Sequence, residues 1–262
     1  MRRPIVKRTV AIAYGAIVAA LLLALVACQK KADTAQPGPK SSAQSVQKGT
    51  PAVGLFDKVG FWATATAEKG TGQLKGTISL GEVVTWTGEE ETGKSYGGEA
   101  DKFYKVKTSV DDVGWVQELY FAVNARPAVI TKETLRYQRD NPTSALGSDK
   151  VPLMTVVALL EEKGDWVRIK FGGRKDVPFL TSYAAQDFWI KKDTISVSEE
   201  DVTVAVLGLR ALFMDTADAK AEALKAIVDD SSYGGSEFVS FLRKELAKAQ
   251  GKDEVQVNVD VD

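Results

Sequence analysis

The first hydrophobic feature of the chain is a run near its start, from Val10 to Val26, which is apolar apart from one tyrosine and one glycine. No charged residue occurs between Thr9 and Gln29, and the segment before the run is basic, with Arg2, Arg3, Lys7 and Arg8. A basic end followed by an apolar core is the layout of a secretory signal. The run is also nearly long enough to cross a bilayer as a helix. The pattern alone therefore leaves two alternatives, a cleaved signal and a retained membrane helix.

The next segment, residues 28–52, is polar and small. It consists mainly of Lys, Ala, Gln, Ser, Pro and Gly and has almost no large apolar side chain. Such a composition cannot bury enough surface to fold, so it predicts a flexible tether. As a coil, the 22 residues from Gln29 to Thr50 would reach about 25 Å, which is enough to clear a lipid headgroup layer.

From Val53 the pattern changes to short runs of β-branched and aromatic residues that alternate with polar residues and are separated by glycine-rich turns. The runs are 60–64, 77–80, 82–87, 102–107 and 114–116. A period of two at this spacing predicts strands of small all-β barrels or sandwiches.

The same order of runs occurs a second time. Ile78–Val84 matches Val151–Val157, Asp101–Lys107 matches Gly164–Lys170, and Gly114–Val116 matches Phe188–Ile190. Strands keep their order while loops change in length. The matches therefore predict a tandem repeat in which Val84 and Val157, and likewise Val106 and Ile169, occupy equivalent strands.

The two copies differ most in two inserted segments, which we expect to be loops. Gly88–Ala100 is inserted in the first copy and Gly172–Gln186 in the second. Loops on a rigid scaffold often carry recognition residues, so these segments are the first places to look for a binding site.

The repeated strands, Leu-x-x-Gly-Glu-Val-Val, then aromatic-Lys-Val-Lys, then Gly-Trp-Val, resemble the bacterial SH3-like domain. The resemblance covers residues 53–125 well. Residues 126–197 depart from it, because Met154-Thr155 replaces Gly-Glu and Phe188 replaces the glycine before Trp189. The resemblance implies two tandem small β-barrels of about five strands each, which bind peptides, cell-wall stems or protein partners.

Beyond Val197 the period becomes helical. Ser198 followed by Glu199-Glu200-Asp201 is a helix start, and apolar residues from Val202 to Phe213 share one face. Thr216 begins a second helix, Gly234-Gly235 ends it, and Ser236 begins a third. Residues 198–250 are thus predicted to be a short three-helix region, and the fold class is mainly β with α. In residues 251–262 valine alternates with polar residues, which predicts a C-terminal strand or a tail.

The apolar run near the start ends in Leu25-Val26-Ala27-Cys28. This stretch resembles the lipobox of bacterial lipoproteins, and the resemblance implies that residues 1–27 are a signal peptide and that Cys28 is acylated, for example with palmitate. Two or three acyl chains anchor a protein stably. We expect a lipid-anchored protein at the cell membrane or the outer membrane, facing the periplasm or the cell exterior. The alternative is a membrane helix with an incidental cysteine.

Composition argues against several classes of function. Removal of residues 1–27 lowers the formal net charge from −1 to −5, which is unfavourable for nucleic-acid binding. The chain has no histidine, and Cys28 is its one cysteine. The commonest general base and metal ligands are thus missing. No nucleophile-elbow, paired-carboxylate or phosphate-binding motif occurs. We expect no enzymatic activity, no catalytic residue, no metal and no cofactor.

Aromatic residues in both copies are the candidate ligand contacts, because grooves of SH3 type hold extended peptides against aromatic side chains. The candidates are Tyr96, Trp115, Phe179, Tyr183 and Trp189. The alternative for the tryptophans is core packing, and for the tyrosines it is closure of a barrel end.

These features lead to two hypotheses of function. The first is a cell-envelope binding protein that recognises a peptide, peptidoglycan or an envelope protein through its repeated modules. The second is a structural or assembly subunit of an envelope complex. A wall hydrolase is a third class, but no catalytic domain is evident. The sequence leaves the ligand and the oligomeric state open.

Overall fold

A computed structural model describes residues 49–138, 144–172 and 186–251 of the protein. All of these residues belong to one compact unit, Gln44–Asp262. Several predictions fall outside the described residues: the signal peptide, Cys28, most of the tether, Phe179, Tyr183 and the C-terminal strand or tail. The described part is mainly β, with two seven-stranded sheets followed by three helices.

The first sheet is antiparallel and has the strand order β3-β2-β6-β5-β4-β1-β7. Its alternating strands bury one face, on which Phe61, Val84 and Val106 form a core with Phe121. Its strands are β1 (Thr50–Gly54), β2 (Val59–Trp62), β3 (Leu74–Ile78), β4 (Val83–Lys94), β5 (Ala100–Lys107), β6 (Val113–Gln117) and β7 (Phe121–Val123).

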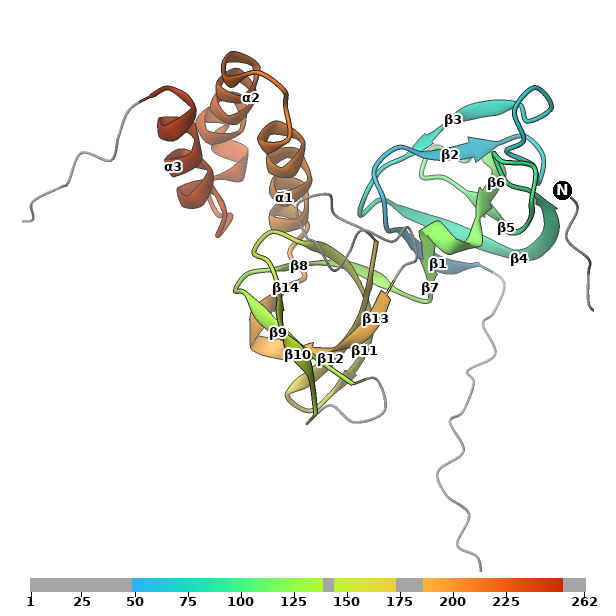
Figure 1. The fold of residues 1–262 in the computed structure, drawn as a ribbon, viewed down its shortest axis with the longest axis horizontal. Coiled ribbons are helices and arrows are strands. Elements are labelled where there is room, and N and C mark those ends of the chain that lie inside the picture. The colour runs from blue at the N-terminus through green and yellow to red at the C-terminus, as the bar shows by residue number, and fades with distance from the viewer. Residues whose placement is uncertain (1–48, 139–143, 173–185, 252–262) are drawn as a thin grey trace, which may run out of the picture. The chain divides into compact units, whose positions relative to one another are not determined.

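The second sheet repeats this arrangement strand for strand, in the order β10-β9-β13-β12-β11-β8-β14, and it curls around its own core (Figure 1). Val157, Ile169 and Phe188 lie in that core. The strands are β8 (Arg126–Ile130), β9 (Thr134–Tyr137), β10 (Ala145–Val151), β11 (Val156–Lys163), β12 (Trp166–Phe171), β13 (Gln186–Lys191) and β14 (Ile195–Ser196).

The register of the two sheets confirms the predicted strand equivalences. Val84 of β4 lies opposite Ala52, and Val157 of β11 lies opposite Ala128 at the same place in its own sheet. In the neighbouring pairs, Val106 faces Trp86 and Ile169 faces Leu159. A short 3-10 helix precedes the last strand of each sheet, η1 (Glu118–Tyr120) and η3 (Lys192–Thr194). Each copy has seven strands instead of the expected five or so.

Two sequence-based boundaries were wrong. Residues 50–52, predicted to belong to the tether, form the first part of β1, and Ala52 is buried in the core. Gly88–Ala100, predicted to be an inserted loop, mostly extends β4 and β5 into a long hairpin. Salt bridges across this hairpin, Glu89 with Lys105 and Glu90 with Lys102, offset the low strand propensity of its acidic sequence.

The helical region contains α1 (Glu199–Leu212), α2 (Ala217–Asp229) and α3 (Val239–Ala249). Ser198 and Thr216 cap α1 and α2, as predicted, by accepting hydrogen bonds from backbone N–H groups three residues later. α2 ends at Asp229, before Gly234, and is followed by the 3-10 turn η4 (Ser231–Tyr233). α3 begins at Val239, later than the predicted start at Ser236.

A buried carboxylate ties the start of α1 to the segment before α3. Asp201 accepts hydrogen bonds from the hydroxyls of Ser196 (2.6 Å) and Ser236 (2.8 Å). It also accepts one from the backbone N–H of Glu237 at 3.0 Å. The hydroxyl of Ser236 also accepts a hydrogen bond from the backbone N–H of Phe238 at 3.3 Å. Ser236 thus lies two residues before the N-cap residue of α3, Phe238, and links that segment to Asp201 of α1.

The helices share a hydrophobic core with the second sheet, and this core reaches the first sheet as well. It contains Val129 and Val156 of the sheet, Val202 and Leu209 of α1, and Leu242 of α3. A β-carbon on Gly81, in the turn before β4, would lie 3.3 Å from Val202 and 3.2 Å from Val156. The turn around Gly81 is therefore packed against α1 and the second sheet.

Candidate functional site

A groove of about 630 Å³ lies where the two sheets and α1 meet. This volume is in the range of pockets that bind small molecules or short peptide segments. The first sheet contributes the turns after β1 and β3, the second sheet contributes residues around β11 and the end of β12, and α1 contributes one face. The lining residues are Leu55, Phe56, Asp57, Lys58, Leu80, Thr155, Val156, Gly172, Val206, Leu209, Arg210, Phe213 and Met214.

The helix side of the groove is apolar and open to solvent at its end. Val206 and Leu209 follow the 3.6-residue period of α1, and Phe213 and Met214 continue the wall beyond the last turn of the helix. Phe213 is 50% exposed and Met214 is 40% exposed. Two adjacent large apolar side chains that remain exposed beside an apolar groove are typical of an interaction surface.

Three charged residues line the groove, Asp57, Lys58 and Arg210. Arg210 donates two hydrogen bonds to the carboxylate of Asp57, from Nε to Oδ2 at 3.0 Å and from a terminal nitrogen to Oδ1 at 2.6 Å. This bidentate pair connects α1 to the turn after β1. Two positive charges against one negative charge make the polar part of the groove net positive.

The titration of Asp57 depends on its partner. Burial alone would raise the pKa of the carboxyl, but the hydrogen bonds and the charge of Arg210 outweigh burial. The backbone N–H of Leu80 and the charge of Lys58 act in the same direction as Arg210. The pKa of Asp57 therefore lies below its ordinary value, and the ion pair is formed at neutral pH.

Lys58 occupies an uncommon backbone conformation at the edge of the groove. Its φ is 57°, in the left-handed region that non-glycine residues rarely adopt. Such strain often occurs at functional sites, because the surrounding structure must hold it in place. Here the turn places Asp57 and Lys58 side by side on the groove wall.

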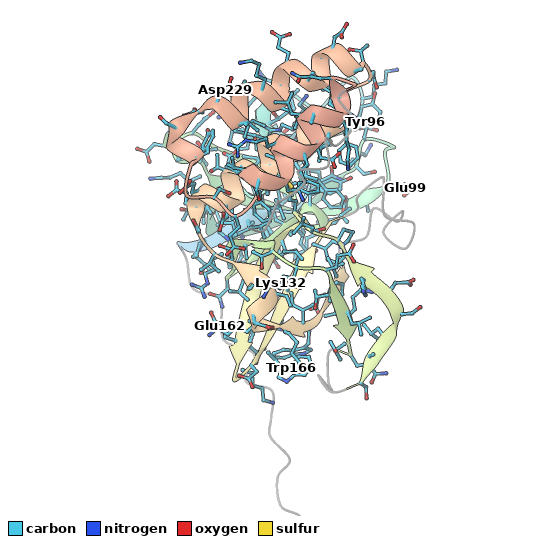
Figure 2. The ribbon with its side chains drawn as sticks, turned by 90° about the vertical axis from the view of Figure 1, so that its left-hand side faces the viewer. Tyr96, Glu99, Lys132, Glu162, Trp166 and Asp229 are labelled. Atoms are coloured by element: carbon cyan, nitrogen blue, oxygen red, sulfur yellow. The ribbon has the colours of Figure 1, made fainter. Side chains whose placement is uncertain are left out.

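Tyr96, the exposed sequence-predicted contact, lies far along the β4–β5 hairpin rather than in the groove. It is 65% exposed and stands in a turn closed by a hydrogen bond from Ser95 N–H to the carbonyl of Glu99, 2.7 Å. Figure 2 shows its side chain near Glu99. A tyrosine so exposed makes little contribution to the core, and its role as a ligand contact stays a prediction.

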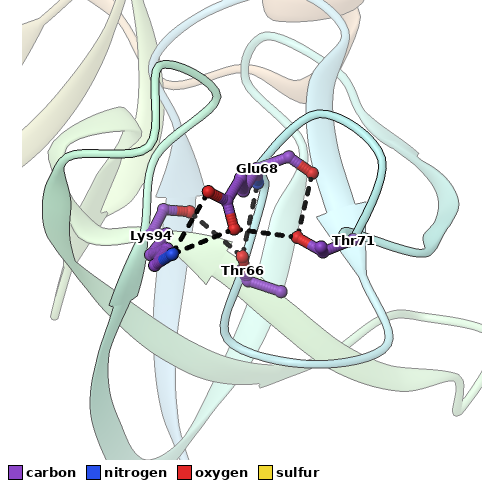
Figure 3. A network of polar contacts seen from close by, with 4 residues as sticks. All are labelled: Thr66, Glu68, Thr71 and Lys94. Atoms are coloured by element: carbon purple, nitrogen blue, oxygen red, sulfur yellow. Dashed lines mark hydrogen bonds and ion pairs between the residues drawn. The ribbon is translucent and has the colours of Figure 1, made fainter.

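A polar network fixes the base of this tip. The carboxylate of Glu68 accepts hydrogen bonds from Lys94 (3.2 Å) and from the hydroxyl of Thr71 (3.1 Å), and Thr66 accepts one from Glu68 N–H (Figure 3). These hydrogen bonds lower the pKa of Glu68. The network connects the loop between β2 and β3 to the hairpin two residues before Tyr96.

The two tryptophans predicted as contacts occupy equivalent positions but differ in burial. Trp115 lies opposite Trp62 and is partly buried, with the ammonium of Lys105 5.6 Å from its ring centre. Trp189 lies opposite Tyr137 and is 5% exposed. The structure therefore favours the packing interpretation for Trp189, while Trp115 retains part of its surface.

The structure does not bring Tyr96, Trp115 and Trp189 into one site, and sequence reasoning missed the groove. Phe213 lies on the predicted apolar face of the first helix and Met214 follows it directly, so this part of the groove wall could have been recognised. Arg210 and Asp57 are 153 residues apart in sequence, and no local pattern connects them.

Two further findings concern only the residues that the structure describes. Within them, no cluster of three or more carboxylate, histidine or cysteine side chains could hold a metal ion. Among their helices, none combines the length and the apolar character needed to cross a membrane.

No protein-family model matches the sequence, and no curated protein matches it. Among solved structures, NlpC2 from Trichomonas vaginalis is 13% identical, with a TM-score of 0.23, and the match covers 70% of this chain. This chain spans 56% of the length of that one. The endolysin LysPBC5 CBD is 13% identical, with a TM-score of 0.19, and the match covers 58% of this chain and 96% of that chain. Likeness of this degree carries no inference about fold or function.

Proposed function

We propose that the protein is a lipid-anchored binding protein of the cell envelope, without enzymatic activity, which holds an apolar segment of an envelope protein in the groove. The single observation that carries the proposal is the groove itself, with exposed Phe213 and Met214 at its end and the Asp57–Arg210 pair on its wall. Apolar pockets with a few fixed polar groups are the usual form of a binding site.

A protein segment fits this groove better than a glycan strand does. The helix side presents aliphatic and aromatic side chains, whereas a sugar would need many hydrogen-bond partners to replace lost water. Lys58 and Arg210 can receive an acidic group of the ligand, with Asp57 as the existing competitor for Arg210.

Anchoring and domain identity belong to the same proposal. The repeated strand order supports two SH3-like modules, residues 53–125 and 126–197, and the lipobox residues Leu25–Cys28 support acylation of Cys28. The anchor would keep the groove at a membrane surface, at the distance that the tether allows. The alternative is a structural or assembly subunit, in which the partner stays bound permanently. The exposed apolar end of α1 is compatible with this alternative as well.

Site-specific photo-crosslinking in cells tests the proposal. A photoreactive phenylalanine analogue at position 213 should form an adduct with an envelope protein, identified by mass spectrometry. The control is the same analogue at Val110, which is 81% exposed in the turn between β5 and β6. A muropeptide adduct at 213, or protein adducts at 110 with none at 213, would mean that the groove does not bind a protein segment.

A further inference from the structure

The residues after α3 have a composition suited to the groove. In residues 255–261 valine occupies every second position: Val255, Val257, Val259 and Val261. In an extended strand these four side chains lie on one face, and the polar residues between them lie on the other. The second face contains two carboxylates near the end, Asp260 and Asp262.

We propose that residues 255–262 bind in cis in the groove between the two sheets and α1, as an extended strand that competes with the external ligand. The regulatory part of this proposal rests on the proposed function, since it needs a ligand to compete with. The docking itself needs only the tail and the groove.

The tail begins close enough to the groove to reach it. Met214 lines the groove and also a smaller hollow of about 320 Å³ between the start of α2 and the end of α3. Ala249, the last residue of α3, lines the same hollow. Three residues, Lys252 to Glu254, connect Gly251 to the proposed strand and extend at most about 10 Å, so the strand has to start beside this hollow.

The length of the apolar wall matches a short strand. From Val206 to Met214 the wall follows α1 and its end, which corresponds to about 12 Å at 1.5 Å per residue. A strand covers this length with about four residues. Two of the tail valines can therefore lie against Val206, Leu209 and Phe213 at one time.

The charges are complementary as well. The lining residues of the groove carry two positive charges, Lys58 and Arg210, and one negative charge, Asp57. Asp260 and Asp262 would place their carboxylates on the polar side of the strand, where Lys58 can receive one. The valine face supplies the buried area, and the charges set the direction of the strand.

Methionine methyl groups provide a direct test. The sequence contains three methionines, Met1, Met154 and Met214. Met154 is buried and Met214 lies on the groove wall, so one label supplies both a control and a reporter. The full chain would be labelled with carbon-13 at the methionine methyl groups and compared with a chain that ends after Gly251.

We expect the Met214 signal to shift on truncation by more than its line width, while the Met154 signal stays in place. In the full chain the Met214 methyl should show nuclear Overhauser contacts to valine methyls. Val257→Ser with Val259→Ser should remove these contacts, whereas the matched pair Gln256→Ser with Asn258→Ser, on the other face, should keep them. If the tail occupies the groove in about nine molecules out of ten, truncation should strengthen binding of an external ligand about tenfold.

Three results would overturn the proposal: an unchanged Met214 signal on truncation, contacts that survive the valine substitutions, or a shift that grows with protein concentration and so reports docking between two chains. Crosslinking at position 213 separates this proposal from the function. If truncation leaves the Met214 signal unchanged while the analogue at position 213 still crosslinks to an envelope protein, tail docking is rejected and the proposed function stands. If the Met214 signal reports tail docking but the truncated chain forms no adduct with an envelope protein, the proposed function is rejected and tail docking stands.

Discussion

The side chain of Met154 fills the space that the missing side chain of Gly208 leaves on α1. A β-carbon at position 208 would come within 2.6 Å of the terminal methyl of Met154. Met154 is 1% exposed and has a φ of 62°, and the equivalent residue of the first repeat is Gly81, with a φ of 75°. The second repeat thus keeps the left-handed turn but uses a large side chain there, which anchors α1 to the sheet.

Gly208→Ala should destabilise the fold, because the added methyl overpacks the contact between Met154 and α1. The cost of overpacking, about 1–3 kcal/mol, exceeds the gain in helix propensity of up to about 1 kcal/mol. A net loss of about 1 kcal/mol lowers the melting temperature by about 2–4 °C in a chain of this size. Thermal unfolding followed by circular dichroism measures it.

A double-mutant cycle identifies the cause of this loss. Met154→Ala alone should cost about 2–5 kcal/mol. With the methionine shortened, Gly208→Ala should cost less than it does in the unmodified chain, and the remaining cost comes from a methyl group of Leu242, which would lie 2.9 Å from the added β-carbon. Gly76→Ala is the control, because no heavy atom lies within 4 Å of a β-carbon there. Simple additivity of the two substitutions would show that Met154 and Gly208 do not depend on each other.

The Asp57–Arg210 pair should make part of the stability depend on pH. The pKa of Asp57 is lower in the folded chain than in the unfolded chain, so the contribution is present above the unfolded value, near 3.8, and is lost as the pH falls through the folded value. Because the pair is partly exposed, we expect less than about 1 kcal/mol. Asp57→Asn should lower the melting temperature at pH 7 and leave it unchanged near pH 2. Equal differences at both pH values would contradict this assignment.

Tyr96→Ala should leave the melting temperature unchanged within about 1 °C, because the side chain is mostly exposed at the hairpin tip. Trp189→Ala, which empties a buried site, should cost about 3–5 kcal/mol. Differential scanning calorimetry on both variants measures the contrast. A large loss for Tyr96→Ala would mean that the tyrosine seals the barrel end, which was the alternative to a contact role.

Much of the strand arrangement could be predicted from the sequence because equivalent strands keep their apolar periods. Val84 and Val157, for example, occur in runs with the same alternation and the same order of neighbours. The β4–β5 hairpin was missed because Glu89, Glu90 and Glu91 are poor strand formers on their own. Their pairing with lysines across the hairpin depends on a register that the sequence does not display.

The groove could not be predicted because its walls come from three distant parts of the chain. Phe56, Val156 and Phe213 are each ordinary apolar residues in their own segments. Only the packing of α1 against both sheets brings them together. Met154, noted in the sequence as a departure from the repeat, is the residue that makes this packing different in the second copy.

The lipid anchor remains a prediction from Leu25–Cys28 and has its own test. Mass spectrometry of the protein isolated from membranes should show a chain that begins at an acylated Cys28. Cys28→Ser should leave the protein unprocessed or release it from the membrane fraction, because a single substitution removes every acyl chain. A mature protein that keeps residues 1–27 and an unmodified thiol would contradict the prediction.

The most direct test of the groove as a binding site is the affinity of the chain for the segment that crosslinks at position 213. Titration calorimetry with that segment as a synthetic peptide should show Phe213→Asp binding at least about 30-fold more weakly than the unmodified chain, as expected for loss of about 2 kcal/mol at an anchor residue. Val110→Asp, the control at an exposed apolar residue outside the groove, should bind as the unmodified chain does. Equal affinity of the Phe213→Asp variant and the unmodified chain, with melting temperatures unchanged, would contradict the account.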